Sequence, residues 1–256
     1  MSRIEDRFAE LKKEGRKALI PYIMAGDPTL SSTKKYILDL VNSGADIIEL
    51  GVPFSDPLAD GPTIQRASER ALKKGTTLKK VLSLVKDIRK KTGIPIILMT
   101  YYNPVFKLGS ELFIREAVKA GVDGVIIPDL IPDEADDFIN ISRQYKLDTV
   151  FLLAPTSTGE RIRKVASASS GFVYYVSITG ITGAKLSLEK MMKKTLLSIK
   201  KKTKKPVAVG FGISTAREAA TVSKLADGVI VGSAIVKLIA QRKNIIPFVK
   251  GLRKAI

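Results

Sequence analysis

The chain has 256 residues, 45% of them hydrophobic, which is typical of a soluble globular protein with a sizeable core and excludes intrinsic disorder. It contains no cysteine and no histidine, so disulfides, zinc sites built from these residues, and Ser-His-Asp or Cys-His nucleophile systems are excluded. Proton transfer in this protein therefore depends on Asp, Glu, Lys or Tyr. The carboxylates do not cluster as a hard metal ion would require, so no metal site is expected.

The net charge of +18 is the strongest bias in the composition. A nucleic-acid or acidic-membrane partner is one interpretation. A lysine-rich coat on the outer faces of helices is the alternative, and the absence of interleaved arginine and aromatic residues favours it. No apolar run is long enough to span a membrane, and the N-terminal residues lack an apolar signal core. A cytoplasmic location is expected.

Short apolar runs separated by amphipathic segments organise the whole chain. Continuous apolar runs indicate strands buried on both faces, as in a parallel sheet. The predicted strands are 18–24, 46–51, 94–99, 124–127, 149–153, 172–176, 207–210 and 228–231. The predicted helices between them include 32–41, 78–89, 111–118, 135–145, 160–168 and 216–225, and two of these open with capping boxes, Ser157 with Glu160 and Thr215 with Glu218.

A weak internal repeat supports regular strand–helix units. The segments 44–48, 121–126 and 225–230 each read as a helix end, an aspartate and a strand. Eight such units in a chain of this length predict a (β/α)8 TIM barrel, an α/β fold, formed as a single domain over 1–256. The extra N-terminal helix, 4–13, is expected to cover the barrel bottom. A doubly wound open sheet is the alternative, but residues 25–28 are not its glycine-rich fingerprint.

Two carboxylates stand out in the segment that follows the second strand. Glu49 lies inside an apolar run, where lost hydration raises a carboxyl pKa towards acid–base use. Asp60 lies in a loop stiffened by prolines, and two carboxylates in different surroundings can hold different protonation states. The structural alternatives are an ion pair for Glu49 and a helix cap for Asp60.

Glycines follow the last three predicted strands. Such glycines let backbone N–H groups approach an anion, and loops after strands seven and eight form the phosphate site of many TIM barrels. The candidate segments are 179–183 after the sixth strand, 210–214 after the seventh, and Gly232 with Ser233 after the eighth. None of the eight strands contains lysine, which disfavours a Schiff-base aldolase. The pattern predicts metal-free acid–base catalysis by Glu49 and Asp60 on a phosphorylated substrate.

Several specific motifs connect the chain to a known family. They are PYIMAGDP at 21–28, IELGVPFSDPLADGP at 48–62, IPDL at 127–130, YYVS at 174–177 with GITG at 180–183, VGFGI at 209–213 and VGSA at 231–234. In these motifs the chain resembles the α subunit of tryptophan synthase over essentially its whole length. The resemblance implies a lyase that cleaves indole-3-glycerol phosphate to indole and glyceraldehyde 3-phosphate, without a cofactor in this chain.

The resemblance also implies roles for individual residues. Glu49 corresponds to the general acid–base and Asp60 to the carboxylate that binds the indole N–H. The remaining substrate-binding residues are Tyr22, Ile64, Tyr101 and Phe211 around the indole, Tyr174 and Thr182 beside the site, and Gly183, Gly212, Gly232 and Ser233 at the phosphate. Tyr22 departs from the phenylalanine of many members, and Ile178 from the arginine of some.

The family implies a partner. Its α subunit works in a complex with a β subunit that carries pyridoxal phosphate, and Pro53, Asp56 and Pro57 are the expected interface residues here. Two alternatives stay open at this point. One is another phosphate-binding barrel isomerase, and the other is a catalytically weak α subunit that mainly activates β.

Overall fold

A computed structural model of the chain describes residues 1–176, 185–210 and 212–256, and for residues 185–190 it describes the backbone alone. The strands are β1 Ala18–Met24, β2 Ile48–Gly51, β3 Ile96–Met99, β4 Gly124–Ile126, β5 Asp148–Val150, β6 Leu152–Leu153, β7 Val173–Val176, β8 Val207–Gly210 and β9 Gly228–Val231. The helices are α1 Arg3–Lys13, α2 Leu30–Asn42, α3 Pro62–Lys73, α4 Leu78–Arg89, α5 Tyr102–Leu108, α6 Ser110–Ala120, the 3-10 helix Pro132–Glu134, α7 Asp136–Gln144, α8 Gly159–Ala168, α9 Lys185–Lys202, α10 Ala216–Ser223, α11 Ser233–Ala240 and α12 Ile246–Ala255. In the described ranges, none of these helices has the length and apolar character of a membrane span.

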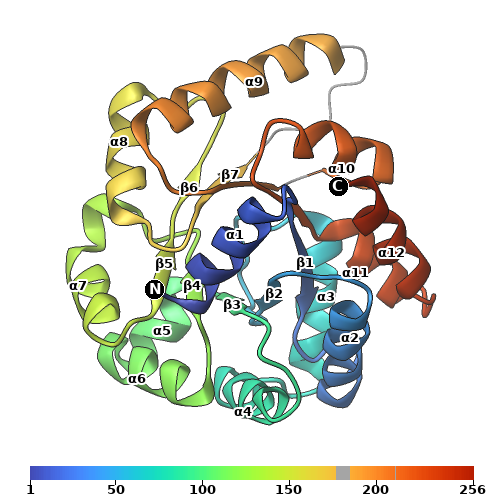
Figure 1. The fold of residues 1–256 in the computed structure, drawn as a ribbon. Coiled ribbons are helices and arrows are strands. Elements are labelled where there is room, and N and C mark those ends of the chain that lie inside the picture. The colour runs from blue at the N-terminus through green and yellow to red at the C-terminus, as the bar shows by residue number, and fades with distance from the viewer. Residues whose placement is uncertain (177–184, 211) are drawn as a thin grey trace.

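The strands form a parallel barrel surrounded by helices, which confirms the predicted TIM-barrel fold (Figure 1). The hydrogen-bonded order is β5-β4-β3-β2-β1-β9-β8-β7-β6. The fifth predicted strand, 149–153, is one continuous stretch of chain that breaks at Phe151 into β5 and β6. Because β5 pairs with β4 and β6 pairs with β7, this stretch closes the barrel.

Helix capping follows the sequence at one predicted site and departs from it at another. The box of Thr215 and Glu218 is present at the start of α10. The predicted capping box of Ser157 and Glu160 is wrong. Thr158 is the N-cap of α8, and its side chain accepts a hydrogen bond from the backbone N–H of Arg161. The Ser157 hydroxyl instead accepts from the backbone N–H of Ala154 at 3.0 Å and closes the preceding turn.

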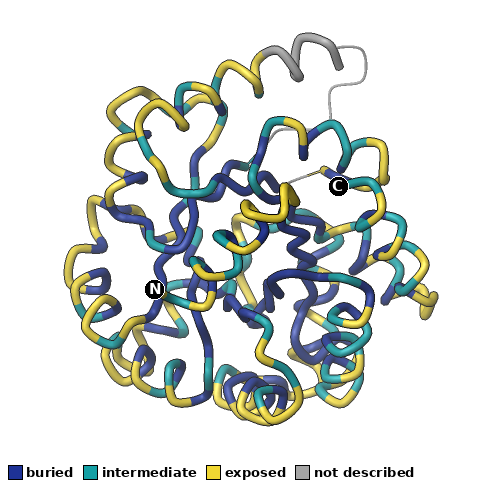
Figure 2. Tube along the Cα trace, viewed as in Figure 1, coloured by how far each residue is buried: buried dark blue, intermediate teal, exposed yellow. Residues whose placement is uncertain are grey.

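Alternation along each strand sorts side chains into two apolar layers. In β1, Leu19 and Ile23 pack in the large layer between strands and helices, whereas Ile20 packs inside the barrel. Most strand residues are buried, and the exposed residues lie on the outer faces of the helices and in the loops (Figure 2). A strand residue thus faces either the helices or the barrel interior, according to its position.

The N-terminal helix α1 closes the bottom of the barrel, as predicted (Figure 1). Ile4, Phe8 and Leu11 are buried and join the apolar cluster of the barrel interior. The Phe8 ring lies 5.6 Å from that of Phe172, which precedes β7. A capping box between Ser2 and Glu5, which the sequence analysis missed, fixes the start of α1.

The internal repeat has a structural role at the same end of the barrel. Each repeated aspartate precedes a strand and accepts a hydrogen bond from the backbone N–H at the start of a neighbouring strand. These bonds join Asp46 to Leu19 (2.8 Å), Asp123 to Ile96 (2.7 Å) and Asp227 to Val207 (3.0 Å).

Cations complete this lower ring. Arg7 of α1 and Arg253 of α12 bind Asp46 at 2.6 and 2.7 Å, and Arg3 binds Asp123 at 2.7 Å. The aspartates are therefore paired and hydrogen-bonded, as buried charges must be.

Replacing Phe8 tests whether α1 belongs to the core. Phe8→Ala should lower the free energy of unfolding by about 3 to 5 kcal/mol, because it removes a buried ring and leaves a cavity. Urea denaturation followed by circular dichroism measures the change, and Lys12→Ala on the exposed face of α1 is the control. A Phe8→Ala loss as small as the control's would mean that α1 is dispensable to the barrel.

Candidate active site

Glu49 lies on β2 and its side chain extends into the barrel. Its neighbour Leu50 packs in the outer layer, and Ile47 packs inside the barrel with α1, so alternation turns Glu49 inward. Across the sheet, Glu49 is in register with Tyr22 of β1 and Ile97 of β3. The side chain is buried, with 2% of the residue exposed, and its Oε2 has no hydrogen-bond partner in the described chain.

This burial sets the protonation of Glu49. Desolvation, and secondarily the negative charge of Asp60, raise the pKa of Glu49 to about 8. No cation pairs with Glu49 within the described ranges, so the ion-pair alternative has no support. Near neutral pH the group is mainly a neutral acid that can donate a proton and, once ionised, accept one.

Asp60 lies in the loop after β2, close enough for its charge to act on Glu49. Burial raises the pKa of Asp60 to about 6, while a hydrogen bond from the Tyr101 side chain lowers it. The helix-cap alternative is wrong, because Gly61 is the N-cap of α3 and no side chain caps that helix. Among the described residues no third acidic side chain joins the pair to form a metal-binding group.

Two tyrosines enclose the carboxylates. Tyr22 and Tyr174 are buried, and desolvation together with the charges of Glu49 and Asp60 raises the pKa of both phenols. Glycine leaves the space that their rings fill. A Cβ on Gly51 would lie 2.1 Å from the Tyr22 hydroxyl oxygen, and one on Gly210 would lie 2.3 Å from that of Tyr174. Both phenols therefore lie directly over strand ends at the barrel mouth.

An apolar wall completes this end of the barrel. Ile64, on the first turn of α3, packs with Tyr22 and Val236 in one buried cluster, against which Met99 lies. Tyr101 is buried as well, and its ring stacks on that of Phe54 at 5.1 Å. The predicted indole-pocket residues Tyr22 and Tyr101 thus lie near the carboxylates, and Ile64 packs beside Tyr22.

Three of the predicted phosphate residues are described, and one of them, Gly232, lies next to Tyr22 of this wall. Gly212 follows β8 with φ +73°, a conformation that favours glycine. Gly232 is the N-cap of α11, Ser233 is its first residue, and a Cβ on Gly232 would lie 3.4 Å from Tyr22. A helix N-terminus next to the pocket suits an anion. Thr182, Gly183 and Phe211 lie outside the described residues.

The predicted partner residues lie on the outer side of the same loop. Asp56 is exposed and accepts a hydrogen bond from the Ser55 hydroxyl, and Pro57 is half-buried. Pro53 is buried within the chain, so it supports the loop from below. Leu58, which the sequence analysis did not single out, is 94% exposed.

Sequence reasoning missed the polar residues of α3 that hold this loop. Gln65 and Ser68 both hydrogen-bond its backbone. A signal was present in the sequence, because Ser68 interrupts the apolar face that Ile64, Ala67 and Ala71 form on the helix. A polar residue on such a face needs a partner.

Comparison with known proteins identifies the family of this barrel. The sequence model described as tryptophan synthase alpha chain matches residues 8–250. The chain belongs to the tryptophan synthase alpha chain family. It is 53% identical to the tryptophan synthase alpha chain of Geobacter sulfurreducens, covering 100% of this chain and 99% of that one. The alpha chain of Geotalea daltonii is 55% identical over 94% of this chain and 91% of its own.

Solved structures of tryptophan synthase agree with this fold. The alpha subunit of Legionella pneumophila superposes with a TM-score of 0.92 at 40% identity, covering 100% of this chain and 98% of that one. A chain of the aminoacrylate-bound Mycobacterium tuberculosis enzyme gives 0.91 at 37% identity over 100% of both. The protein is thus a lyase subunit of tryptophan biosynthesis, and alpha chains of this family work with a beta subunit.

The raised pKa of Glu49 has a consequence for stability. The folded state favours the protonated form of Glu49. The contribution of this group to the free energy of unfolding is therefore complete below pH 4.5 and is lost as pH rises through about 8. Glu49→Gln, which cannot ionise, should match the wild type at pH 4 and exceed its unfolding free energy at pH 9 by roughly 3 to 5 kcal/mol. Denaturation at both pH values measures this difference. Equal stabilities at pH 9 would show that Glu49 ionises without penalty.

Proposed function

We propose that this chain cleaves indole-3-glycerol phosphate to indole and glyceraldehyde 3-phosphate in the cytosol, a carbon–carbon lyase reaction of the retro-aldol type. One observation carries the proposal. The buried Glu49 carboxyl group, one oxygen of which has no hydrogen-bond partner among the described residues, lies near a second, more acidic carboxyl group in a tyrosine-lined barrel mouth. Family membership supplies the substrate, and the site supplies acid–base groups suited to it.

Glu49 is the general acid–base of the proposal. Its protonated form donates to C3 of the indole ring, which makes the ring an electron sink. The bond from C3 to the glycerol carbon then breaks, and its electrons neutralise the ring. The hydroxyl on that carbon becomes the aldehyde, and its proton returns to the Glu49 carboxylate. The enzyme thus ends the cycle in its starting protonation state.

Asp60 is the electrostatic partner. Its lower pKa keeps it ionised when Glu49 is still protonated, so it can accept the indole N–H and stabilise positive charge on the ring. In this assignment Tyr22, Ile64, Tyr101, Tyr174 and Phe211 line the indole pocket, Thr182 contacts Asp60, and Gly183, Gly212, Gly232 and Ser233 bind the phosphate. Phosphate binding at α11 anchors the substrate beside Tyr22.

The exposed part of the Asp60 loop is the proposed contact with a beta subunit. Asp56, Pro57 and the projecting Leu58 form its outer surface. Pro53 contributes indirectly, by fixing the buried start of the loop. The chain itself needs no pyridoxal phosphate in this proposal, because its two carboxylates suffice for the proton transfers, and the beta subunit would carry that cofactor.

Isosteric amides test the two carboxylates. Glu49→Gln should lower the rate of indole formation by about a hundredfold or more, since it removes the only proton donor of the scheme, and Asp60→Asn should impair it severely. Indole release is measured spectrophotometrically, with Asp137→Asn on the exposed face of α7 as the control. Near-wild-type turnover by Glu49→Gln would defeat the mechanism.

The two pKa values also predict a bell-shaped pH dependence. Activity should rise as Asp60 ionises near pH 6 and fall as Glu49 loses its proton near pH 8, with both limbs belonging to the coupled pair. The substrate phosphate also titrates near pH 6 and could contribute to the fall in activity at low pH. The Asp60→Asn variant separates the two causes, because in its residual activity the contribution of Asp60 to that fall should be missing. A kcat/KM profile that stays flat from pH 5 to 9 contradicts the assignment.

A further inference from the structure

The loop that carries Asp60 is held at both ends by one face of α3. Near its start, the Ser68 hydroxyl accepts from the backbone N–H of Phe54 and donates to the Phe54 carbonyl, both at 2.8 Å. At its end, the Gln65 side-chain amide donates to the Asp60 carbonyl at 2.9 Å. Gln65 and Ser68 are three residues apart, so they share one side of the helix.

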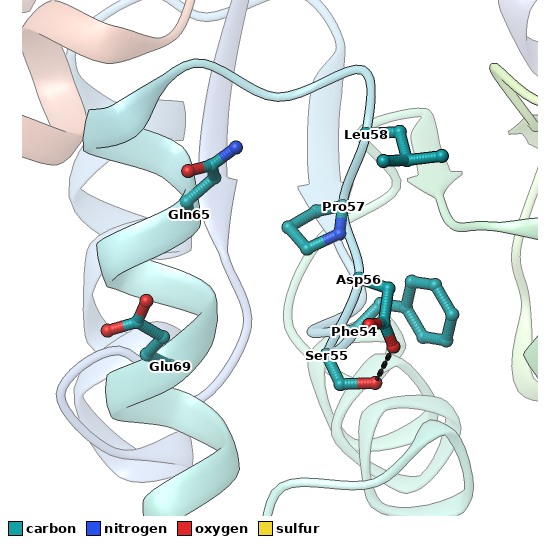
Figure 3. Close-up of a pocket in the computed structure, with 7 residues that line it drawn as sticks. All are labelled: Phe54, Ser55, Asp56, Pro57, Leu58, Gln65 and Glu69. Atoms are coloured by element: carbon teal, nitrogen blue, oxygen red, sulfur yellow. Dashed lines mark hydrogen bonds between the residues drawn. The ribbon is translucent and has the colours of Figure 1, made fainter.

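Between these two anchors the loop stands clear of the helix. A pocket of about 350 Å³ separates Phe54, Ser55, Asp56, Pro57 and Leu58 from Gln65 and Glu69 of α3 (Figure 3). Most of the loop residues above the pocket are exposed. Few packing contacts therefore hold the middle of the loop, and the position of its catalytic end depends on its anchors.

Tyr101 extends the Ser68 anchor to the Asp60 carboxylate. Its ring stacks on the Phe54 ring, and its hydroxyl accepts from the backbone N–H of Ala59 at 3.1 Å. The same hydroxyl hydrogen-bonds the Asp60 side chain. The hydrogen bonds between the Ser68 hydroxyl and the Phe54 backbone therefore influence the position of the Asp60 carboxylate, through Phe54 and Tyr101.

The helix is itself fixed to the barrel. Arg70, two residues beyond Ser68, binds Asp27 in the loop after β1 through two hydrogen bonds of 2.8 and 2.7 Å. Asp27 is 3% exposed, whereas the Arg70 side chain is 39% exposed, so a partly exposed guanidinium pairs with a buried carboxylate. A helix tied to β1 in this way is a firm base from which Gln65 and Ser68 can hold the loop.

We propose that Gln65 and Ser68 are positioning residues of the lyase reaction, which act by fixing Asp60 at its working distance from Glu49. The inference rests on the proposed role of Asp60. Neither side chain needs to touch the substrate. Their removal lets the loop move into the pocket beneath it, and a shift of this kind displaces the carboxylate from the indole N–H.

Gln65→Met and Ser68→Ala, made separately in the full chain, test this inference. Each should lower kcat for indole release by about tenfold to a hundredfold, because misplacing a catalytic group costs rate. KM should change little, since the pocket and the phosphate residues are intact. Glu69→Gln is the matched control: Glu69 lines the same pocket, and no hydrogen bond joins it to the loop among the described residues.

A double-mutant cycle then separates positioning from a general structural effect. In an Asp60→Asn background, Gln65→Met should lower the residual rate no further, because it acts through the group already removed. Thermal denaturation confirms that each variant is folded. The inference fails if folded Gln65→Met and Ser68→Ala keep wild-type kcat, or if Gln65→Met costs the same factor in both backgrounds. Full activity of Asp60→Asn alone would overturn the role of Asp60 as well.

Discussion

The site depends on the cost of ionising a carboxyl group inside a barrel of apolar strands. Glu49 is almost fully buried, and one of its oxygens has no hydrogen-bond partner in the described chain. No cation of the described residues offsets the desolvation of Glu49, so the proton stays on the acid until about pH 8. The fold supports this arrangement, because α1 seals the barrel from below and the paired aspartates keep the cationic side chains at that end.

The surrounding residues give the carboxyl groups of Glu49 and Asp60 different pKa values and therefore different roles. Asp60 reaches the same space from a loop, is less buried than Glu49 and receives a hydrogen bond from Tyr101, so its pKa lies lower. Glycines at the strand ends admit Tyr22 and Tyr174 around the pair. One carboxyl group can then donate a proton while the other carries charge, which is what protonation of an indole ring requires. This is the chemistry that we propose for the chain in its role in tryptophan biosynthesis.

Much of this could be predicted from the sequence, because buried parallel strands and catalytic loops leave strong local patterns. The strands 18–24, 207–210 and 228–231 match the structure at both ends, as does the helix 78–89. The break at Phe151 could not be foreseen, since it reflects how the closing strand divides its pairing between β4 and β7. The cap of α8 by Thr158 was missed because two adjacent hydroxyl residues compete for one position. The anchoring of the Asp60 loop by Gln65 and Ser68 depends on contacts between separate elements, which periodicity does not encode.

The central claim concerns the protonation state of Glu49, and it can be measured without turnover. Carbon-13 labelling of glutamate side chains and NMR titration from pH 4 to 10, with Glu49→Gln used to assign the resonance, report the ionisation of this carboxyl group directly. The account predicts a resonance that titrates near pH 8 and remains largely protonated at pH 7. A resonance that titrates near pH 4.5, like those of exposed glutamates, would contradict it.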